Sequence, residues 1–290
     1  MRIPANTLVD TTIPEETLVN TIKLRVLTLA MLVAASTPAL SESQTVPMPV
    51  SDEASIPKGP MGDAIKRGKV LLTDTHKQLP KNVGNGLNCT SCHLNAGTTA
   101  YASPWVGLAG AFPEYRSRSG KVILLQERIN DCFQRSMNGK PLAFDSADMN
   151  AIMAYMKWLS AGIPTGTNVA GRGFEKIDTS LSPDPVHGKT IYTSQCASCH
   201  GTEGQGTKNP QGGYIFPPVW GKDSFNVGAG MARMYTAAAF VKHNMPLGQG
   251  GTLSAQDAVD VAAYFTQQPR PDYPARVKDW PKGERPKDAR

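Results

Sequence analysis

One five-residue motif, C-x-x-C-H, occurs twice in the chain and constrains its fold more than any other feature. The segment GNGLNCTSCHLNAG at 84–97 is echoed by YTSQCASCHGTEG at 192–204. A second echo follows each motif, because DSADMNAIMAYMKWLSAG at 145–162 is similar to LSAQDAVDVAAYFTQQP at 253–269. Since the parts come in the same order in both halves, the sequence predicts two copies of one small domain.

The later segment of each half predicts an amphipathic helix. Ser146 and Ser254 are natural N-caps, and Asp148 and Asp257 place acidic side chains in the first turn. Apolar residues recur at helical spacing, whereas strand patterns are weak throughout the chain. We therefore predict an all-α fold with long loops between the helices.

Length and composition indicate where the domains end. The 290 residues, of which 40% are hydrophobic, suffice for two modest domains. Gly, Pro and Thr are frequent from 161 to 185, so we place a linker at 166–185, the first domain at 42–165 and the second at 186–290. The tail after Pro269 is rich in Pro, Lys and Arg, which predicts a segment that wraps the surface or frays.

Residues 1–41 have the pattern of a secretory signal peptide. Lys23 and Arg25 flank an apolar stretch at 26–35 that is too short to span a bilayer, and Ala39-Leu40-Ser41 is a small-residue cleavage site. The residues before Lys23 are long for a charged region and indicate a start codon placed too early. An N-terminal membrane anchor is the alternative. We expect a periplasmic protein whose mature form has no stable membrane span.

The formal net charge of +6 favours small anions or acidic proteins as partners. The basic residues are scattered among Gly and Pro and form no long Lys/Arg run. We therefore expect no nucleic-acid partner.

The motif C-x-x-C-H is the attachment signature of c-type haem. Each cysteine forms a thioether with one haem vinyl group, and the histidine that follows becomes an axial ligand of the iron. A disulfide or a thioredoxin-like redox pair explains neither the histidine nor the repeat. The sequence thus predicts two covalently bound haems. The predicted attachment residues and ligands are Cys89, Cys92 and His93 for the first haem, and Cys196, Cys199 and His200 for the second.

The second haem needs a sixth ligand, and HNMPLGQGG supplies Met245, 45 residues after His200. A Met-Pro loop ahead of the last helix resembles the methionine loop of class I cytochromes c. A thioether ligand would raise the reduction potential. Lys242 and His243 are rival ligands, and Met245 as core filler is the simplest alternative.

The fifth cysteine, Cys132, has no partner for an internal disulfide. It lies 39 residues after His93, where the first domain should supply its sixth ligand. The repeat points instead to a position next to Met137, which leaves Cys132 as a buried hydrophobe. Arg128 and Arg135 lie on the helical face of Cys132, and such cations favour the thiolate that binds iron. Spacing alone leaves the two interpretations even.

Two C-x-x-C-H motifs, the block NDCFQRSMNG and the loop NMPLGQGG together resemble the thiosulfate dehydrogenase family over about Gly62 to Thr266. The resemblance implies two class I cytochrome c-like domains and a periplasmic enzyme. Its reaction would couple two thiosulfates into tetrathionate, reversibly in some members. Two electrons would pass to an external acceptor, such as another c-type cytochrome or a high-potential electron carrier.

The same resemblance implies roles for individual residues. It makes Cys132 the distal ligand of the first haem, and it places Arg118, Arg128 and Ser136 in the active site. Asn244 stands where some members carry a lysine that acts as an alternative ligand, so no Lys/Met exchange is implied here.

Three other functions fit part of the pattern. A dihaem electron carrier like the cytochromes c4 would use Met137 as a ligand and leave Cys132 inert. A SoxA-type cytochrome would also carry a Cys-ligated haem but would conjugate thiosulfate to a carrier protein. A dihaem peroxidase fits less well.

Overall fold

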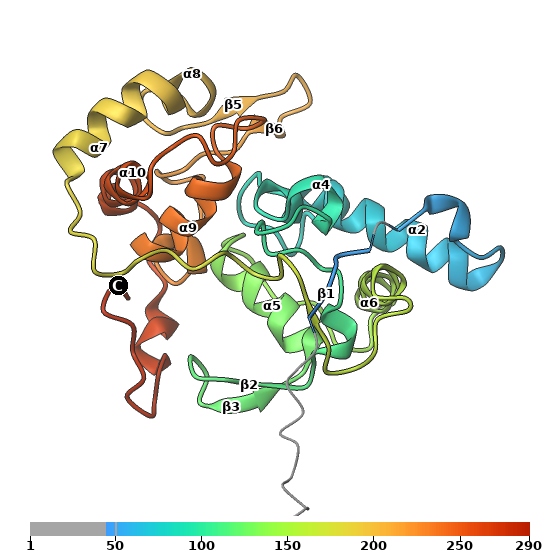
Figure 1. The fold of residues 1–290 in the computed structure, drawn as a ribbon. Helices are drawn as coiled ribbons and strands as arrows, with labels where there is room; N and C mark the ends of the chain where they lie inside the picture. Colours follow the sequence, from blue (N-terminus) through green and yellow to red (C-terminus); the bar gives the residue numbers. More distant parts are fainter. Residues whose placement is uncertain (1–44, 50) are drawn as a thin grey trace, which may run out of the picture. The chain divides into compact units, whose positions relative to one another are not determined.

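Helices dominate the structure, a computed structural model that describes residues 45–49 and 51–290; the expected signal peptide at 1–41 lies outside the described residues. Among the described residues the strands are short and form three pairs. Parallel β1 (Thr45–Val46) pairs with β4 (Asn168–Val169), and antiparallel pairs join β2 (Glu114–Arg116) to β3 (Lys121–Ile123) and β5 (Thr207–Lys208) to β6 (Tyr214–Phe216). The α-helices are α2 (Pro60–Thr73), α3 (Thr75–Gln78), α4 (Leu94–Gly97), α5 (Leu125–Arg135), α6 (Ala147–Leu159), α7 (Pro185–Ile191), α8 (Ala197–His200), α9 (Met234–Asn244) and α10 (Ala255–Gln267) (Figure 1).

The two echoed segments form α6 and α10, as predicted. Ser146 Oγ accepts a hydrogen bond from the Met149 N–H at 3.1 Å, and Ser254 Oγ accepts one from the Asp257 N–H at 3.0 Å. These bonds satisfy amide groups that the first turn of a helix leaves without a partner. The N-cap predictions are confirmed.

Each closing helix packs against an earlier helix of its own half, α6 against α2 and α10 against α7 (Figure 1). In each pair, a glycine on the earlier helix allows the two helices to approach closely. A Cβ on Gly68 would lie 2.0 Å from the Ala151 carbonyl oxygen, and a Cβ on Gly188 would lie 1.9 Å from that of Asp260. Ala151 and Asp260 hold the same place in the repeat. The repeat thus extends to helix packing.

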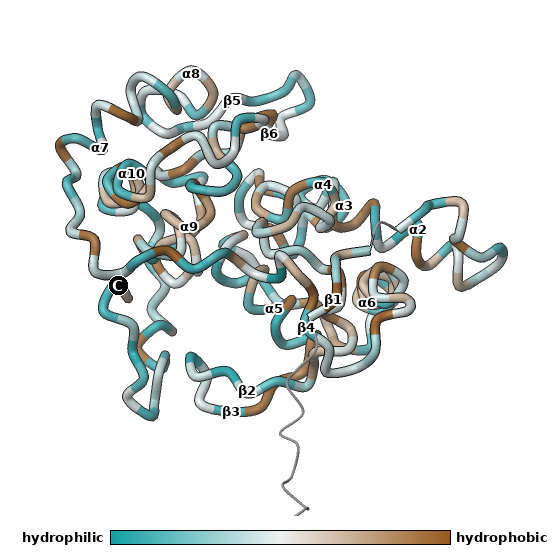
Figure 2. Tube along the Cα trace, in the orientation of Figure 1, coloured by the Kyte–Doolittle hydropathy of each residue, from teal (hydrophilic) through white to brown (hydrophobic). Residues whose placement is uncertain are grey.

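Two separate hydrophobic cores lie under these helix pairs. Figure 2 shows apolar residues along α6 and α9, whereas the segment after α10 is mostly hydrophilic. The first core includes Leu71, Leu72, Phe133, Met149, Ile152, Tyr155 and Leu159, and the second includes Ile191, Tyr192, Trp220, Val241, Val259, Val261 and Phe265. Burial of this apolar surface is the main force that holds each helix pair together.

The tail after α10 packs against the first half rather than fraying. The Trp280 N–H donates to the Arg118 carbonyl at 2.7 Å, and Asp279 accepts two hydrogen bonds from Arg135 at 2.7 and 2.8 Å. Of the two outcomes predicted for this tail, wrapping is the one observed. No helix in the described part of the chain is both long and apolar enough to cross a bilayer.

Candidate active site

A cavity of about 1300 Å³ is lined by residues of both halves and collects the chemistry predicted for the first half. Apolar side chains, among them Leu72, Trp105 and Phe133, form part of its wall. The predicted residues that line it are Cys89, Cys92, His93, Arg118, Arg128, Cys132 and Ser136. The structure therefore brings every site residue predicted for the first half to one space.

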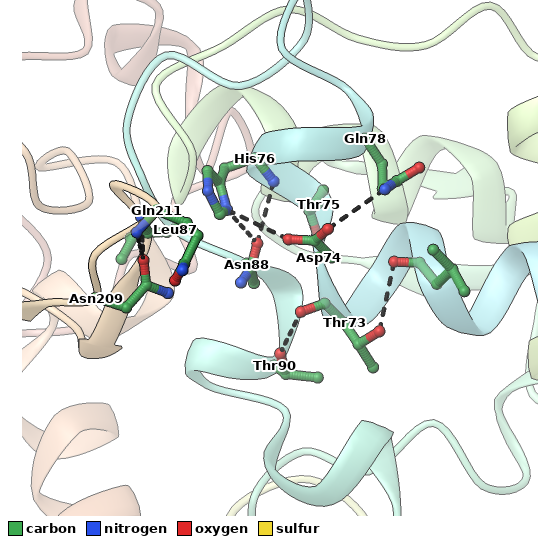
Figure 3. A network of polar contacts seen from close by, with 12 residues as sticks. Thr73, Asp74, Thr75, His76, Gln78, Leu87, Asn88, Thr90, Asn209 and Gln211 are labelled. Carbon is green, nitrogen blue, oxygen red and sulfur yellow. Dashed lines mark hydrogen bonds and ion pairs between the residues drawn. The ribbon is translucent and has the colours of Figure 1, made fainter.

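The first C-x-x-C-H motif begins as a short 3₁₀ turn, Cys89–Ser91, held by the residues around α3. Asn88 Oδ1 accepts a hydrogen bond from the His76 N–H at 3.1 Å (Figure 3). The fully buried Thr75 accepts one from the Cys89 N–H at 3.1 Å, and its Oγ1 lies 3.4 Å from Cys89 Sγ. These bonds fix the first cysteine against the helix that precedes it.

His93 is oriented by a carbonyl group. Its Nδ1 lies 2.6 Å from the Ser103 oxygen, which can only accept, so Nδ1 carries the proton. The lone pair is then on Nε2, the nitrogen that binds a metal in this tautomer. Trp105 lies beside the imidazole, with ring centroids 5.1 Å apart. His93 is thus prepared as an axial ligand.

Cys132 differs from the other cysteines of this cavity. Arg128 Nη1 donates to Cys132 Sγ at 3.0 Å, one turn earlier on α5. Burial opposes ionisation, but the charge of the Arg128 guanidinium outweighs it and lowers the pKa of the Cys132 thiol to about 6. Burial raises the pKa of Cys89 and of Cys92 to about 12. Cys132 is thus the thiolate of the set, and this form binds iron.

Met137, the alternative ligand, also borders the cavity and belongs to the first core, where it is 2% exposed. Position in the cavity therefore does not decide whether Met137 or Cys132 is the distal ligand of the first haem. What favours Cys132 is the hydrogen bond that Arg128 Nη1 donates to its Sγ, which stabilises the thiolate. The assignment of Cys132 as distal ligand stays a prediction.

Arg118 sits in the turn between β2 and β3 and meets the second half of the chain. Its Nη1 donates to the Gly228 carbonyl at 2.6 Å, and its guanidinium lies 4.9 Å from the centre of the Trp280 ring. Burial and the charge of Arg135 lower the pKa of Arg118 to about 10, so it stays charged at neutral pH. Ser136 caps the end of α5.

Among the cavity residues that no sequence pattern singles out are Arg233, Asp279 and Trp280. Arg135 and Asp279 are 144 residues apart, so no local pattern joins them. The sequence predicts Arg135 as a neighbour that favours the Cys132 thiolate. Its guanidinium is instead held by Asp279 and lies 4.7 Å from the centre of the Tyr273 ring. Two aromatic residues in this hydrophilic tail, Tyr273 and Trp280, are the sequence signal that could have indicated that the tail packs against the rest of the chain.

The second C-x-x-C-H motif repeats the histidine geometry. His200 Nδ1 lies 2.8 Å from the Pro217 carbonyl oxygen, and burial lowers the pKa of His200, which keeps it neutral. Cys196 ends a π-helical turn, Tyr192–Cys196, that runs into α8. Met245 and Cys196 both pack against the second core. This placement is compatible with a His/Met pair.

The rivals of Met245 are engaged elsewhere. Lys242 Nζ donates to the Gly251 carbonyl at 3.0 Å and also to that of Leu253. His243 forms an ion pair with Glu175. These contacts favour Met245 as the sixth ligand of the second haem.

The donor chemistry of both halves fits c-type haem. Each half offers two thiols and an imidazole whose Nδ1 is held by a backbone carbonyl, and the cavity has apolar walls that suit a porphyrin face. Neither thiol pair forms a disulfide, so all four remain available for thioether bonds.

Comparison with known proteins covers both halves. The model described as "SoxA/TsdA, cytochrome c domain" matches residues 80–165, and the one described as "Cytochrome C oxidase, cbb3-type, subunit III" matches 183–265. The chain therefore contains two cytochrome c domains and two c-type haems, and the predicted all-α dihaem fold is confirmed.

Complete relatives give a closer match. The chain is 50% identical to a thiosulfate dehydrogenase of Psychrobacter arcticus over 89% of this chain and 78% of that one. The solved thiosulfate dehydrogenase (TsdBA) of Marichromatium purpuratum superposes with a TM-score of 0.75 at 37% identity, over 85% of this chain; the match spans 52% of that longer chain. A SoxA subunit of an L-cysteine S-thiosulfotransferase, from Paracoccus pantotrophus, is 28% identical over 40% of this chain.

Proposed function

Because this chain belongs to the thiosulfate dehydrogenase family, we propose that it joins two thiosulfate ions into one tetrathionate ion and passes two electrons to an external acceptor. The observation that carries the proposal is Cys132. Its sulfur shares one cavity with the first haem-binding motif and accepts a hydrogen bond from Arg128. A carrier that only relays electrons has no need of a buried cationic cavity at one haem.

The reaction forms one sulfur–sulfur bond and releases two electrons, with no proton taken up or lost. Two thiosulfates give one tetrathionate, so four negative charges become two. Two dianions repel each other strongly at short range, and fixed cations offset that cost. Arg118 and Arg128 are cations of the cavity wall that would bind sulfonate oxygens. The Ser136 hydroxyl would add a neutral hydrogen bond.

Haem, when bound, supplies one-electron acceptance in each half. His93 and Cys132 would hold the first iron, and His200 and Met245 the second. Thiolate stabilises Fe(III), whereas thioether favours Fe(II), so the first haem should have the lower potential. The second half then offers the exit for electrons. Its partner would be another c-type cytochrome or a different high-potential electron carrier.

Location forms part of the proposal. The pattern of residues 1–41 supports export to the periplasm followed by cleavage near Ala39. Cell fractionation combined with N-terminal sequencing of the mature protein tests this. A protein that retains its first 41 residues in the cytoplasm would contradict it.

A steady-state assay of the purified holoprotein tests the reaction itself. Thiosulfate with ferricyanide should give tetrathionate, and tetrathionate with a reduced viologen reports the reverse direction. If neither pair supports turnover while both haems reduce and reoxidise normally, the protein is an electron carrier of the c4 type.

Arg118 gives the matched test of anion binding. Arg118→Ala should lower kcat/KM for thiosulfate roughly tenfold or more, because a hydrogen bond to a charged group contributes about 1.5–3 kcal/mol. The haem absorption spectrum should not change. Lys121→Ala is the control, since Lys121 lies on the same hairpin but pairs with Glu127 at 2.6 Å. Equal kinetics for the two variants would make Arg118 an ordinary surface cation.

A further inference from the structure

The coupling reaction needs two anion sites, and the first half supplies residues for only part of that task. Nine Lys and Arg residues but only five Asp and Glu residues line the cavity, so its wall has a surplus of positive charge. A second anion can bind only to a cation of this wall that no carboxylate already compensates.

Most cavity arginines already have a partner. Arg128 donates to Cys132 Sγ, and Arg135 holds the Asp279 carboxylate at 2.7 Å. Arg116 lies 3.2 Å and Arg172 3.7 Å from one Glu114 oxygen. Carboxylate partners compensate three of these charges, which leaves them less able to attract a further anion.

Arg233 is the exception. It is the residue before α9, so it comes from the second half of the chain, which also contributes Asp279 and Trp280 to the cavity wall. Its Nε is buried without a hydrogen-bond partner, and no carboxylate oxygen of the described residues lies within the 4 Å of an ion pair. A buried donor without a partner is costly unless a bound group satisfies it.

Electrostatic effects link Arg233 to the arginines of the proposed substrate site. Burial lowers the pKa of Arg233, with Asp288 opposing and Arg116 adding to the effect. Arg233 and Arg128 both contribute to the lowered pKa of Arg118. Arg118 therefore lies within electrostatic reach of both, one from each half.

A second buried arginine shows that orphaned atoms alone do not make a site. Arg270 also has buried nitrogens without partners. Its guanidinium, however, lies 4.4 Å from the centre of the Phe225 ring and donates to the Phe265 carbonyl at 2.8 Å. It is outside the cavity lining. Arg135 is on the cavity wall and its Nε also lacks a hydrogen bond, but that Nε lies 3.7 Å from Asp131 Oδ1 and the guanidinium holds Asp279. Among the described residues of the cavity wall, Arg233 is therefore the arginine that combines an unsatisfied buried donor with no carboxylate at ion-pair distance.

We propose that Arg233 binds the sulfonate group of the second thiosulfate, while Arg128 binds the first beside Cys132. The inference rests on the proposed thiosulfate coupling and adds a substrate-binding residue from the second half. The two sulfonates of the product, tetrathionate, would then span the cavity from Arg128 to Arg233. It follows that the active site is complete only when both halves of the chain are present.

Equilibrium binding of tetrathionate to the fully oxidised holoprotein, measured by titration calorimetry, tests the proposal. Arg233→Gln should weaken tetrathionate binding roughly tenfold or more, since one charge-assisted contact is lost. Arg233→Lys should restore part of the affinity. Arg172→Gln removes the same charge from the same cavity wall, but Arg172 lies near Glu114, so affinity should change by less than about threefold.

The outcomes separate this inference from the proposed function. If the wild type neither binds tetrathionate nor oxidises thiosulfate, the proposed function fails. If the wild type does both, and Arg233→Gln binds tetrathionate like Arg172→Gln, the role of Arg233 alone is refuted. A shift in the midpoint potential of the first haem with unchanged tetrathionate affinity would also refute it, because Arg233 would then pair with a haem carboxylate.

Discussion

The two halves of the molecule orient their haem-binding histidines alike but differ in what faces them. His93 and His200 each direct Nδ1 to a backbone carbonyl, at 2.6 and 2.8 Å. In the first half α5 adds Cys132 with Arg128 beside it. In the second half the predicted ligand is Met245, whose neighbour Asn244 is buried and donates to the Phe240 carbonyl at 3.0 Å.

This difference indicates how one scaffold can serve two tasks. The shared part is the histidine, its carbonyl partner and the packed helix pair. The part that differs is the predicted distal ligand and the charge near it: a thiolate with an arginine beside it in the first half, and a neutral thioether in the second. Chemistry on an anion needs the first arrangement, and electron transfer to a partner needs the second.

Removal of Cys132 should have the largest effect, because it takes away what distinguishes the first half. In Cys132→Ala, turnover should be abolished, the spectrum of the first haem should change and its reduction potential should rise, since no thiolate stabilises Fe(III). Redox titration followed by absorption spectroscopy measures the last two. Met137→Ala should keep the wild-type spectrum of the first haem. The opposite pattern in the two variants would make Met137 the ligand.

A change at Met245 tests the other side of the comparison. Met245→His should lower the reduction potential of the second haem, because imidazole favours Fe(II) less than a thioether does. The first haem should keep its spectrum, which resolves the two halves. Lys242→Ala is the control, since Lys242 already donates to two carbonyls. A spectrum that changes only in the Lys242 variant would overturn the assignment.

Sequence reasoning reached the features that depend on neighbouring residues. The N-caps Ser146 and Ser254 act within one helical turn, and the haem-binding motif is contiguous. Both features can therefore be predicted from the sequence. The contact between Arg135 and Asp279 joins residues 144 apart and depends on how the tail packs. Arg233 likewise enters the cavity only through the placement of α9. Such contacts carry no local pattern.

Substitution of the two closely packed glycines should have an effect of intermediate size on stability. The effect should be similar in the two halves, because Gly68 and Gly188 make equivalent contacts. Gly68→Ala and Gly188→Ala should each lower the free energy of unfolding by about 1–3 kcal/mol, because the new Cβ would overlap a carbonyl oxygen. Gly230→Ala, where a Cβ meets nothing within 4 Å, should change stability by less than about 0.5 kcal/mol. Chemical denaturation measures all three. Gly68 and Gly188 variants as stable as the wild type would show that the helix pairs can shift apart.

The two halves differ in the residue that precedes the closely packed glycine, which is Arg67 before Gly68 and His187 before Gly188. In the first half Arg67 pairs with Asp148 at 3.1 Å. In the second, His187 lies 2.9 Å from Asp260 and 4.0 Å from Asp257. Arginine stays charged at every physiological pH, whereas histidine does not. The first pair should therefore be insensitive to pH near neutrality, and the second should not.

The smallest expected effect follows from this contrast. The hydrogen bond to Asp260, with the charges of Asp257 and Asp184, raises the pKa of His187 above its ordinary 6.5, while bonds from His187 and the Asp184 N–H lower the pKa of Asp260 despite its burial. His187 thus stabilises the second half fully below pH 6.5, and this contribution is lost as pH rises through the raised pKa. The Asp260 contribution has the opposite sign and is lost only in acid, as pH falls below its ordinary 3.8. Denaturation followed at the second haem should show a small loss of stability from pH 6 to pH 8 that His187→Gln removes, whereas Arg67→Gln should leave it in place. A pH profile that is the same in wild type and His187→Gln would mean that the pair contributes nothing to the fold, and the halves would then differ only at their haem sites.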